Sequence, residues 1–396
     1  MSEVEFELRK LGDLIEIFNN KRVPLSAKQR EGLEKIYPYY GAQGIVDYVD
    51  DYIFDGKYIL IAEDGENLKS NNKSICTLAT GKYWVNNHAH IIKGNDKTNT
   101  DFLYYKLNSI NFAPYITGSA QPKLNKENLL NIELYIPSKE YQDKISKVLT
   151  LLDKKIQINN QINQELEAMA KTLYDYWFVQ FDFPDQNGKP YRSSGGKMVY
   201  NPELKREIPE GWVVAKLNEV VDLISGYPFS SNDYVISGKY KLYTIKNVQD
   251  GYTVDKVDNY LDFLPSNMSH ECQLRRGDLI MSLTGNVGRV GMVYEDDVLL
   301  NQRVLKLNPI NKTHKSFIYS FFRSDVTKAH LENMSTGTSQ KNLSPIDIGN
   351  MMIPFPSESL LSKFLDNLNM LENNLVENQQ LTQLRDWLLP MLMNGQ

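Results

Sequence analysis

The sequence predicts an α+β protein of two tandem, similar domains joined by two long antiparallel coiled-coil helices in a pseudo-twofold arrangement. Three observations carry this prediction. One polar segment occurs twice, each half mixes strand-like with helix-like stretches, and each half ends in a long segment with apolar residues at heptad spacing. The 396 residues are enough for two or three domains.

The internal repeat is the strongest of the three observations. Gln340 minus Gln121 gives a shift of 219, at which "TGSAQPKLNKENLLNIELYIPS" lies on "TGTSQKNLSPIDIGNMMIPFPS" without a gap. In the same order along both halves, "KLGDLIEIF" matches "KLNEVVDLI", "VNNHAHII" matches "LLNQRVLKL" with Asn87 set on Asn301, and "DFLYYKL" matches "SFIYSFF". Because the matched blocks keep their order, we expect a tandem duplication.

Short strands framed by helices are predicted within each half. Residues 10–18 have the apolar spacing of a helix, and residues 36–92 alternate β-branched and aromatic runs with turn residues. Residues 99–110 predict a helix capped by Asn99 or Thr100, and residues 130–138 predict a closing strand. The second half repeats the order, with a helix over 316–334 and a closing strand at 350–357.

Each long segment carries an apolar seam with alternating steps of four and three residues. The first seam consists of Ile145, Leu149, Leu152, Ile156, Asn159, Asn163, Leu166, Ala170 and Leu173. At the shift of 219 the second consists of Phe364, Leu368, Leu371, Leu375 and Asn378, after which it moves to Leu381, Leu384 and Leu388 until Pro390 ends the helix. We expect the two helices to pack antiparallel as a rod; two separate helices, each on its own domain, are the alternative.

These patterns give the expected domain boundaries. A first α+β domain spans residues 1–138 and a central helix spans 139–180. A linker rich in Pro and Gly spans 181–215, anchored at its start by the aromatic residues of 174–183. A second α+β domain spans 216–357, and a C-terminal helix spans 358–396.

The motifs point away from catalysis. Neither phosphate-binding glycine motif is present, and Cys76, His88 and His90 are the only candidate metal ligands, so no metal site is expected. A loose PD…ExK spacing, Pro184-Asp185 with Glu203 and Lys205, falls in the linker and leaves a stand-alone nuclease as a disfavoured alternative. The charged N-terminus and the absence of a long apolar run indicate a cytoplasmic protein without a membrane segment.

Polar and basic side chains recur at matched places in both halves. Hydroxyls reach phosphates, Gln pairs with adenine, and Lys or Arg contacts guanine or phosphate, so these side chains predict DNA binding. The candidates are Lys21, Arg22, Tyr39, Tyr40, Gln43, His88, Ser119, Gln121, Lys123, Ser230, Ser231, Lys246, Asn247, Thr284, Asn286, Arg289, Gln302, Arg303, Thr338, Gln340 and Lys341.

The repeated block, "YPYYGAQGIVDYVDDYIFDGKYILIAEDG" and "GDLIMSLTGNVGRVG" resemble the target-recognition domains of specificity (S) subunits of type I restriction-modification systems. "WFVQFDFPDQNGKPYRSSGGKMVYNPELKREIPEGW" resembles the central conserved region of that family. The resemblance covers essentially the whole chain. It implies a non-catalytic, sequence-specific DNA-binding subunit: each domain reads one half of a bipartite site on double-stranded DNA, and the helical rod sets the spacer.

The resemblance also implies partners for host defence. Two DNA methyltransferase (M) subunits would bind S-adenosylmethionine and methylate adenine, and restriction (R) subunits would use ATP and Mg, so this chain itself is expected to hold no cofactor. The net charge of −5 fits such a complex, because partners can supply the phosphate contacts. A two-domain coiled-coil scaffold that binds no DNA is the alternative from another functional class.

Overall fold

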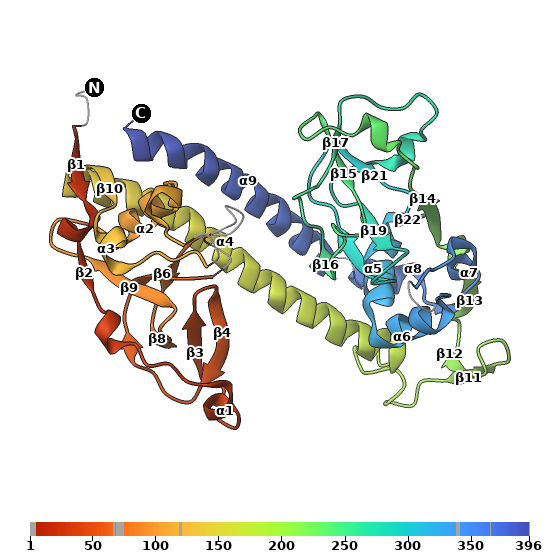
Figure 1. The fold of residues 1–396 in the computed structure, drawn as a ribbon. Coiled ribbons are helices and arrows are strands. Elements are labelled where there is room, and N and C mark those ends of the chain that lie inside the picture. The colour runs from red at the N-terminus through yellow and green to blue at the C-terminus, as the bar shows by residue number, and fades with distance from the viewer. Residues whose placement is uncertain are drawn as a thin grey trace. The chain divides into compact units, whose positions relative to one another are not determined.

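A computed structural model describes residues 5–65, 68, 75–118, 121–337, 341–364 and 366–395. Its contacts divide the chain into two compact units, residues 1–155 with 381–396 (unit 1) and residues 156–380 (unit 2). Each unit combines a mixed α+β domain with part of each long helix, α4 (Lys139–Tyr174) and α9 (Asp366–Asn394) (Figure 1). The predicted fold class is confirmed.

Unit 1 contains two four-stranded sheets and a two-stranded pair. The first sheet has the order β2 (Ile15–Ile17), β9 (Ala89–Gly94), β6 (Tyr58–Ala62) and β7 (Cys76–Ala79). The second has the order β4 (Gly44–Val49), β3 (Tyr37–Gly41), β8 (Lys82–Val85) and β5 (Phe54–Asp55). The pair is β1 (Phe6–Lys10) with β10 (Glu133–Pro137), and the short helices are α1 (Ala27–Arg30), α2 (Thr100–Asn108) and α3 (Lys126–Leu130).

Unit 2 repeats this topology with five strands in its first sheet. Its first sheet has the order β14 (Val221–Ser225), β22 (Val304–Pro309), β19 (Leu279–Ser282), β20 (Val290–Met292) and β16 (Gly251–Tyr252). Its second has the order β17 (Tyr260–Leu261), β15 (Tyr240–Tyr243), β21 (Val298–Leu300) and β18 (Gln273–Leu274), and the pair is β13 (Val213–Lys216) with β23 (Met352–Phe355). The helices are α5 (Lys315–Arg323), α6 (Asp325–Met334), α7 (Pro345–Gly349) and α8 (Glu358–Phe364). The parallel contact of β3 with β8 has its counterpart in β15 with β21, so the duplication predicted from the sequence is visible strand by strand.

Strand pairing corrects one predicted equivalence. The Asn86 N–H donates to the Tyr40 carbonyl at 3.0 Å, and the Asn301 N–H donates to the Tyr243 carbonyl at 3.1 Å. Asn86, not Asn87, is therefore the counterpart of Asn301. A sequence match alone could not choose between two adjacent asparagines, whereas a strand register is fixed to the residue because a slip of one reverses every side chain.

Two helix predictions were wrong in part. Residues 10–18 form a 3-10 turn, Leu11–Asp13, followed by β2, because pairing with β9 outweighs the local apolar spacing. The helix expected over 316–334 is divided into α5 and α6 at Ser324, whose hydroxyl accepts the Thr327 N–H and caps the second helix. By contrast, Asn99 caps α2 as predicted.

The long helices pack antiparallel in each unit, as predicted. In unit 2 the Asn159 amide donates to Asn378 Oδ1 at 3.0 Å, and the Asn374 amide donates to Asn163 Oδ1 at 2.9 Å, so residue numbers rise on α4 as they fall on α9. In unit 1 Arg385 of α9 pairs with Asp153 of α4 at 2.9 Å. The predicted seam is buried or half-buried along both helices up to Asn378.

The predicted end of the second seam was wrong. Leu384 is 44% exposed, and α9 continues through Pro390 to Asn394. Met393 is 1% exposed in the core of unit 1 with Leu389 and Leu392 beside it. Burial of these side chains stabilises the helical turns around the proline and offsets the hydrogen bond that Pro390 cannot make.

The linker contains more structure than its composition predicts. A hairpin of β11 (Met198–Asn201) and β12 (Arg206–Pro209) lies within it. Of its aromatic anchor, Tyr174, Phe178 and Phe181 are buried as expected, but Tyr176 is half-exposed. Within the described residues, no helix combines the length and apolar character that a membrane span requires.

Candidate nucleic-acid interface

The twin polar segments form loops with the same backbone hydrogen bonds. In unit 1, Thr117 and Lys123 exchange two N–H···O bonds of 2.9 and 2.7 Å, and the Leu124 N–H donates to the Glu63 carbonyl at 2.9 Å. In unit 2, Thr336 and Asn342 exchange bonds of 2.9 and 2.8 Å, and the Leu343 N–H donates to the Leu283 carbonyl at 2.9 Å. The shared sequence therefore encodes a shared loop frame.

Glycine is required at the start of each loop. Gly118 has φ +88°, and a Cβ there would lie 2.4 Å from the Gln121 carbonyl oxygen. Gly337 has φ +101°. Both backbones lie in the left-handed region that side chains other than glycine adopt at a cost, which explains the repeated "TG".

Other segments lie beside each loop, and we call these segments together with the loop the loop rim. In unit 1 they are residues 63–65 after β6, residues 86–88 after β8, and the β3–β4 turn, whose Ala42 lies beside Gly65. In unit 2 they are residues 283–289 after β19 and residues 301–303 after β21. The Glu63 N–H donates to the His88 carbonyl at 2.9 Å, and in unit 2 the Leu283 N–H donates to the Arg303 carbonyl at 3.0 Å. His88 and Arg303, both predicted DNA contacts, therefore occupy equivalent positions.

Ion pairs organise the rim of unit 1. Glu63 accepts from Arg22 Nη1 at 2.7 Å and lies 3.3 Å from Lys123 Nζ, and Asp64 lies 2.9 Å from His88 Nδ1. Burial opposes ionisation of Glu63, but hydrogen bonds from Arg22 and the nearby positive charges outweigh it, so the pKa of its carboxyl is lowered. Gln121 and Lys123 remain exposed at the loop surface.

A buried histidine lies beneath the same loop. His90 is 1% exposed; its Nε2 lies 2.7 Å from the Leu124 carbonyl and its Nδ1 lies 2.8 Å from the Asn19 amide nitrogen. This pair of contacts selects the neutral ring, with Nε2 donating and Nδ1 accepting. Burial lowers the pKa of His90, although the hydrogen bond to Leu124 and the nearby Glu63 oppose that effect.

The rim of unit 2 borders an open hollow of about 800 Å³. It is lined by Asn286, Arg289 and Lys341, three predicted DNA contacts, and by Gln249 and Tyr252 among others. Lys341 Nζ lies 3.2 Å from Glu332, and the Gly285 N–H donates to the Lys341 carbonyl. Lys341 aligns with Pro122 at the shift of 219, so the lysines of the two loops are not equivalent.

Several other predicted contacts are in the rim or near it but differ in exposure. Lys21, Gln43, Gln302 and Arg303 are exposed, whereas Tyr40 is half-buried against Tyr83 and Thr284 forms the backbone bridge to Asn342. Ser230, Ser231 and Lys246 are exposed outside the rim, with Lys246 paired to Asp258 at 2.7 Å. Ser119, Thr338 and Gln340 lie outside the described residues.

Three predicted contacts have internal partners that account for their presence. Tyr39 is 2% exposed, and its hydroxyl bonds the backbone of Leu25. Asn247 is 3% exposed and donates to the carbonyls of Val254 and Lys256. Arg22 is largely buried against Glu63. We therefore assign these three side chains a structural role, because their polar groups are already used inside the protein.

Sequence reasoning missed the residues that hold the rims in place. Glu63 and Asp64 fall between the matched blocks. Lys328 and Glu332 lie on α6, which has no α-helical counterpart among the described residues of unit 1. One signal was available for Glu63: it follows the apolar strand "YILIA" as the first charged residue, where a strand-end carboxylate is expected.

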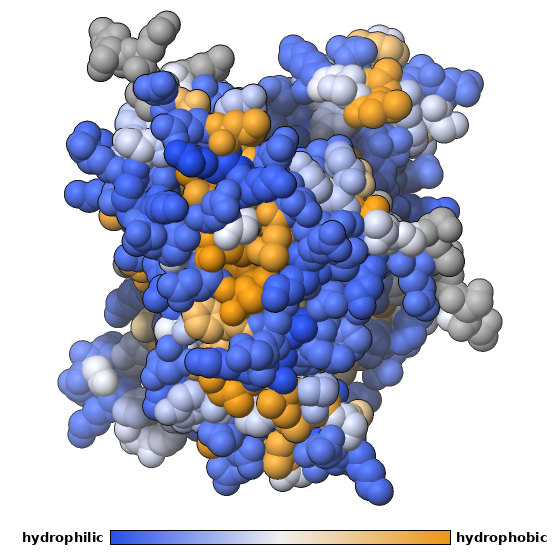
Figure 2. All heavy atoms as spheres, turned by 60° about the vertical axis from the view of Figure 1, so that its left-hand side comes forward, coloured by the Kyte–Doolittle hydropathy of each residue, from blue (hydrophilic) through white to orange (hydrophobic). Residues whose placement is uncertain are grey.

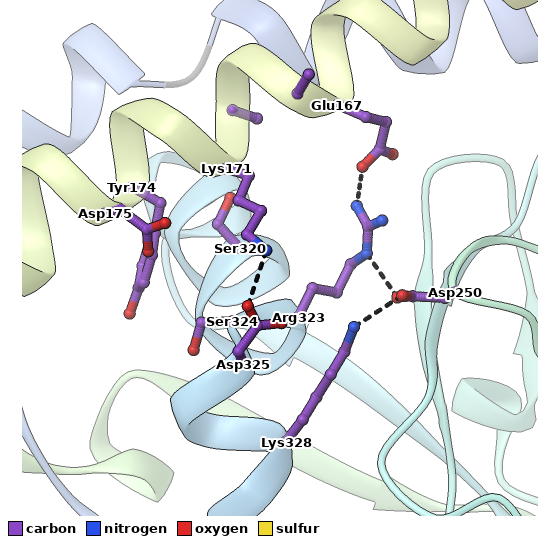
Figure 3. A pocket seen from close by; sticks show the side chains of 12 residues that line it. Glu167, Lys171, Tyr174, Asp175, Asp250, Ser320, Arg323, Ser324, Asp325 and Lys328 are labelled. Carbon is purple, nitrogen blue, oxygen red and sulfur yellow. Dashed lines mark hydrogen bonds and ion pairs between the residues drawn. The ribbon is translucent and has the colours of Figure 1, made fainter. Parts of the chain in front are cut away.

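Within unit 2, the C-terminal part of α4 contacts the α+β domain through a network of ion pairs, drawn in Figure 3. Arg323 of α5 contacts Glu167 of α4 and lies 2.9 Å from Asp250, which also accepts from Lys328 at 2.7 Å. Lys171 pairs with Asp325 at 2.8 Å. Burial opposes ionisation of Asp250, but the hydrogen bonds from Lys328 and Arg323 outweigh it and its pKa is lowered.

Apolar side chains also reach the surface, as the face drawn in Figure 2 shows. On α4 the half-exposed ones follow a second heptad stripe, distinct from the seam, and Met370 of α9 matches Leu151 at the shift of 219. The stripe on α4 comprises Val148, Leu151, Ile158, Ile162 and Met169. Apolar side chains at heptad spacing outside a filled seam are typical of a surface that binds a partner.

The PD…ExK spacing of the linker does not form a catalytic arrangement among the residues that the structure describes. Asp185 Oδ1 accepts the N–H groups of Asn187 and Lys189 and serves as a turn residue, while Glu203 and Lys205 lie in the β11–β12 turn. Among the described residues, no three His, Cys, Asp or Glu side chains cluster closely enough to hold a metal ion. Cys76 and Cys272 are both buried as free thiols.

Comparisons with known proteins agree with this arrangement. The family profile described as "Type I restriction modification DNA specificity domain" matches residues 3–168 and 209–385. A Haemophilus influenzae protein that carries the provisional name of a type I restriction enzyme specificity subunit is 28% identical over 94% of this chain and 90% of its own length. The MjaVIII specificity subunit of Methanocaldococcus jannaschii is 25% identical over 99% and 92%. The crystal structure of a type I S subunit from M. genitalium superposes with a TM-score of 0.60 at 16% identity, covering 99% of this chain and 97% of that one.

Proposed function

Because the chain belongs to the type I restriction-modification DNA specificity family, whose members are non-catalytic subunits that recognise DNA sequence, we propose that each loop rim reads one half of a bipartite site. The observation that carries this proposal is the pair of rims with one backbone frame and different exposed side chains. Reading two half-sites requires such a difference, because each base pair presents its own pattern of donors and acceptors in the major groove.

The proposed contacts are the exposed residues in or beside the rims, together with the half-buried Arg289. They are Lys21, Gln43, His88, Gln121 and Lys123 in unit 1 and Asn286, Arg289, Gln302, Arg303 and Lys341 in unit 2. The exposed Ser230, Ser231 and Lys246 outside the rim suit phosphate contacts, which position a protein on the duplex without reading its sequence. Residues 1–138 and 216–357 would thus be the readers.

The paired helices within 139–180 and 358–396 would set the spacer between the half-sites. The seam and its asparagine pairs support a rod of fixed register, because polar seam residues bond only when correctly aligned. The proline-containing connection 181–215 would join the rod to the second reader.

Catalysis would come from partner subunits. The exposed stripe on α4 is the proposed docking surface for adenine methyltransferase subunits, which would bring S-adenosylmethionine. Restriction subunits, which would use ATP and Mg, would join that complex. A stripe of five half-exposed apolar side chains is costly to keep in water, and a protein partner would cover it.

Selection of bound duplexes from a random pool by the chain with its methyltransferase partner tests the reading function. We expect a motif of two specified blocks separated by an unspecified spacer, with affinity that falls as salt rises. A complex that retains no sequence preference would instead support the scaffold alternative.

Insertion of one heptad into both helices, after Leu152 and after Leu384, tests the spacer function. Seven residues lengthen a helix by about 10 Å, or about three base pairs of B-DNA. We expect a spacer longer by about this amount with both specified blocks unchanged. Insertion of seven residues into the β11–β12 turn, outside the rod, is the control and should leave the spacer length as it was.

A further inference from the structure

The hollow of unit 2 holds one basic side chain in an unusual setting. Lys123, Lys246 and Lys341 each have a carboxylate within ion-pair distance. Arg289 has none among the residues that the structure describes. Its Nη1 instead donates to the Gln249 side-chain oxygen at 3.2 Å. No described carboxylate therefore offsets the positive charge of Arg289, and a neutral amide orients its side chain.

A second amide completes the support. With the Asn286 amide oriented to satisfy its hydrogen bonds, its oxygen accepts from Arg289 Nη2 at 3.1 Å and from Nη1 at 3.3 Å. A guanidinium has five N–H donors, so these three bonds leave two for a ligand. A planar donor group that is already oriented loses less entropy on binding than a mobile one.

The backbone of Arg289 is fixed as well. Ser282 is 1% exposed, its hydroxyl accepts the Arg289 N–H at 3.2 Å, and its own N–H donates to the Arg289 carbonyl at 3.0 Å. The same hydroxyl donates to the Asn286 carbonyl at 2.5 Å. The turn that carries Arg289 and Asn286 is thus pinned to the end of β19.

The loop that carries Gln249 is held from helix α4. Its neighbour Asp250 accepts from Arg323 and Lys328, and Arg323 in turn contacts Glu167 of α4 (Figure 3). A chain of contacts within unit 2 therefore runs from the coiled coil to the amide that orients Arg289. Glu167 does not line the hollow, so any effect it has on Arg289 is one of positioning.

We propose that Arg289 reads a guanine in the half-site of unit 2, with Gln249 and Asn286 as positioning residues. The inference rests on the proposed function. Guanine presents two acceptors, O6 and N7, that match two guanidinium donors, whereas adenine places a donor at the position of O6. Gly285 and Gly288 border the hollow and present no side chain that would keep a base edge away.

The test is selection and sequencing of duplexes bound by the complete complex, with the wild-type chain and the Arg289→Ala, Arg289→Lys and Glu167→Gln variants. We expect Arg289→Ala to lower the preference for guanine over adenine at one position of one half-site by about 5- to 150-fold, and to leave the other half-site unchanged. Arg289→Lys should lose most of this preference because it lacks the planar pair of donors. Glu167→Gln should lower the same preference by a smaller factor.

Arg276→Ala provides a matched control, because Arg276 is an exposed arginine of the same unit that pairs with Asp296 at 3.0 Å and does not line the hollow. It should leave the motif unchanged. Thermal unfolding of each variant and its intact readout of the other half-site show that the chain is folded.

The outcomes separate this inference from the function on which it rests. In one outcome the wild-type motif is bipartite and Arg289→Ala keeps its guanine, while affinity falls equally for all sequences and the salt dependence falls by about one ion. This outcome would identify Arg289 as a phosphate contact and would overturn the inference alone. A wild-type complex without any sequence preference would overturn the proposed function itself. A change confined to Glu167→Gln would also contradict the assignment of Arg289.

Discussion

Units 1 and 2 hold their twin loops with the same backbone hydrogen bonds but over different interiors. Strand register makes Glu63 of unit 1 the equivalent of Leu283 in unit 2, and His90 the equivalent of Leu305. The loop of unit 1 therefore rests on a buried ionic and hydrogen-bonded cluster, whereas the loop of unit 2 rests on leucines. The two copies share the loop frame, which depends on backbone geometry, but differ in the side chains beneath it.

The difference extends to the surface. In unit 1 Glu63 and Asp64 engage Lys123 and His88, so the rim is internally paired. In unit 2 Arg289 and Arg303 have no carboxylate within ion-pair distance among the described residues, so its rim carries more unpaired positive charge. Two readers with one frame can thus present different charge patterns to DNA, and four changes would break or sharpen that comparison.

The largest effect is expected from replacing Glu63 with the leucine of unit 2. Glu63→Leu should destabilise unit 1 by about 3 kcal/mol, because it leaves the largely buried Arg22 without its carboxylate. Hydrogen exchange measures the opening free energy of each unit separately. Arg22→Leu combined with Glu63→Leu should recover most of the loss, since no charge is then left unpaired. Equal destabilisation by the single and double variants would contradict this account.

Alanine at either loop glycine should be next in size. Gly118→Ala should cost about 2 kcal/mol, since it combines a positive φ with a Cβ too close to the Gln121 carbonyl. Gly337→Ala should weaken the corresponding loop of unit 2 by at least the cost of its positive φ. Gly81→Ala is the control in unit 1, because its φ is +79° but nothing lies within 4 Å of the added Cβ, and it should cost about 1 kcal/mol.

Lowering the pH should reduce the stability of unit 1 more than that of the matching region of unit 2. Burial lowers the pKa of His90 in the folded state, so above its unfolded value of about 6.5 the ring is neutral in both states and pH has no effect through it. As the pH falls below about 6.5, the unfolded chain binds a proton that the folded chain does not, and stability falls by up to about 1.4 kcal/mol per pH unit.

Hydrogen exchange at pH 7.5 and 5.5 measures this difference. His90→Gln should lower the opening free energy of unit 1 at pH 7.5 by about 1 kcal/mol and remove most of its loss between the two pH values. Leu305 cannot titrate, so the opening free energy of the matching region of unit 2 should change little. An unchanged pH profile in His90→Gln would show that another group controls the acid response.

The smallest effect is expected at the exposed lysines. Lys123→Ala and Lys341→Ala should each weaken DNA binding by the complex a few-fold for all sequences and lower its salt dependence by about one ion, if each contacts a phosphate. The two losses should be similar, because each lysine already pairs with a carboxylate, Lys123 with Glu63 at 3.3 Å and Lys341 with Glu332 at 3.2 Å. Binding titrations at several salt concentrations measure both quantities, and a loss confined to one base at one position of the site would contradict a phosphate contact.

The sequence alone determined the features that depend on repeated local pattern. The duplication, the closing strands, the seam up to Asn378 and the "TG" loops all follow from spacing, because apolar periodicity and glycine conformations are properties of short segments. Asn159 and Asn378 were predicted at matched places in the two seams, and the Asn159 amide donates to Asn378 Oδ1.

Only the tertiary structure decided where spacing and environment conflict. The apolar spacing of residues 10–18 predicts a helix, but the segment forms a 3-10 turn and strand β2, because β9 pairs with the backbone of residues 15–17. Tyr39 and Arg22 read as surface contacts but lie inside, and α9 passes Pro390 because the side chains of Leu392 and Met393 are buried. The different roles of Glu63 and Leu283 could not be predicted either. The partner of a buried side chain lies far away in the chain, and the sequence around that side chain does not identify it.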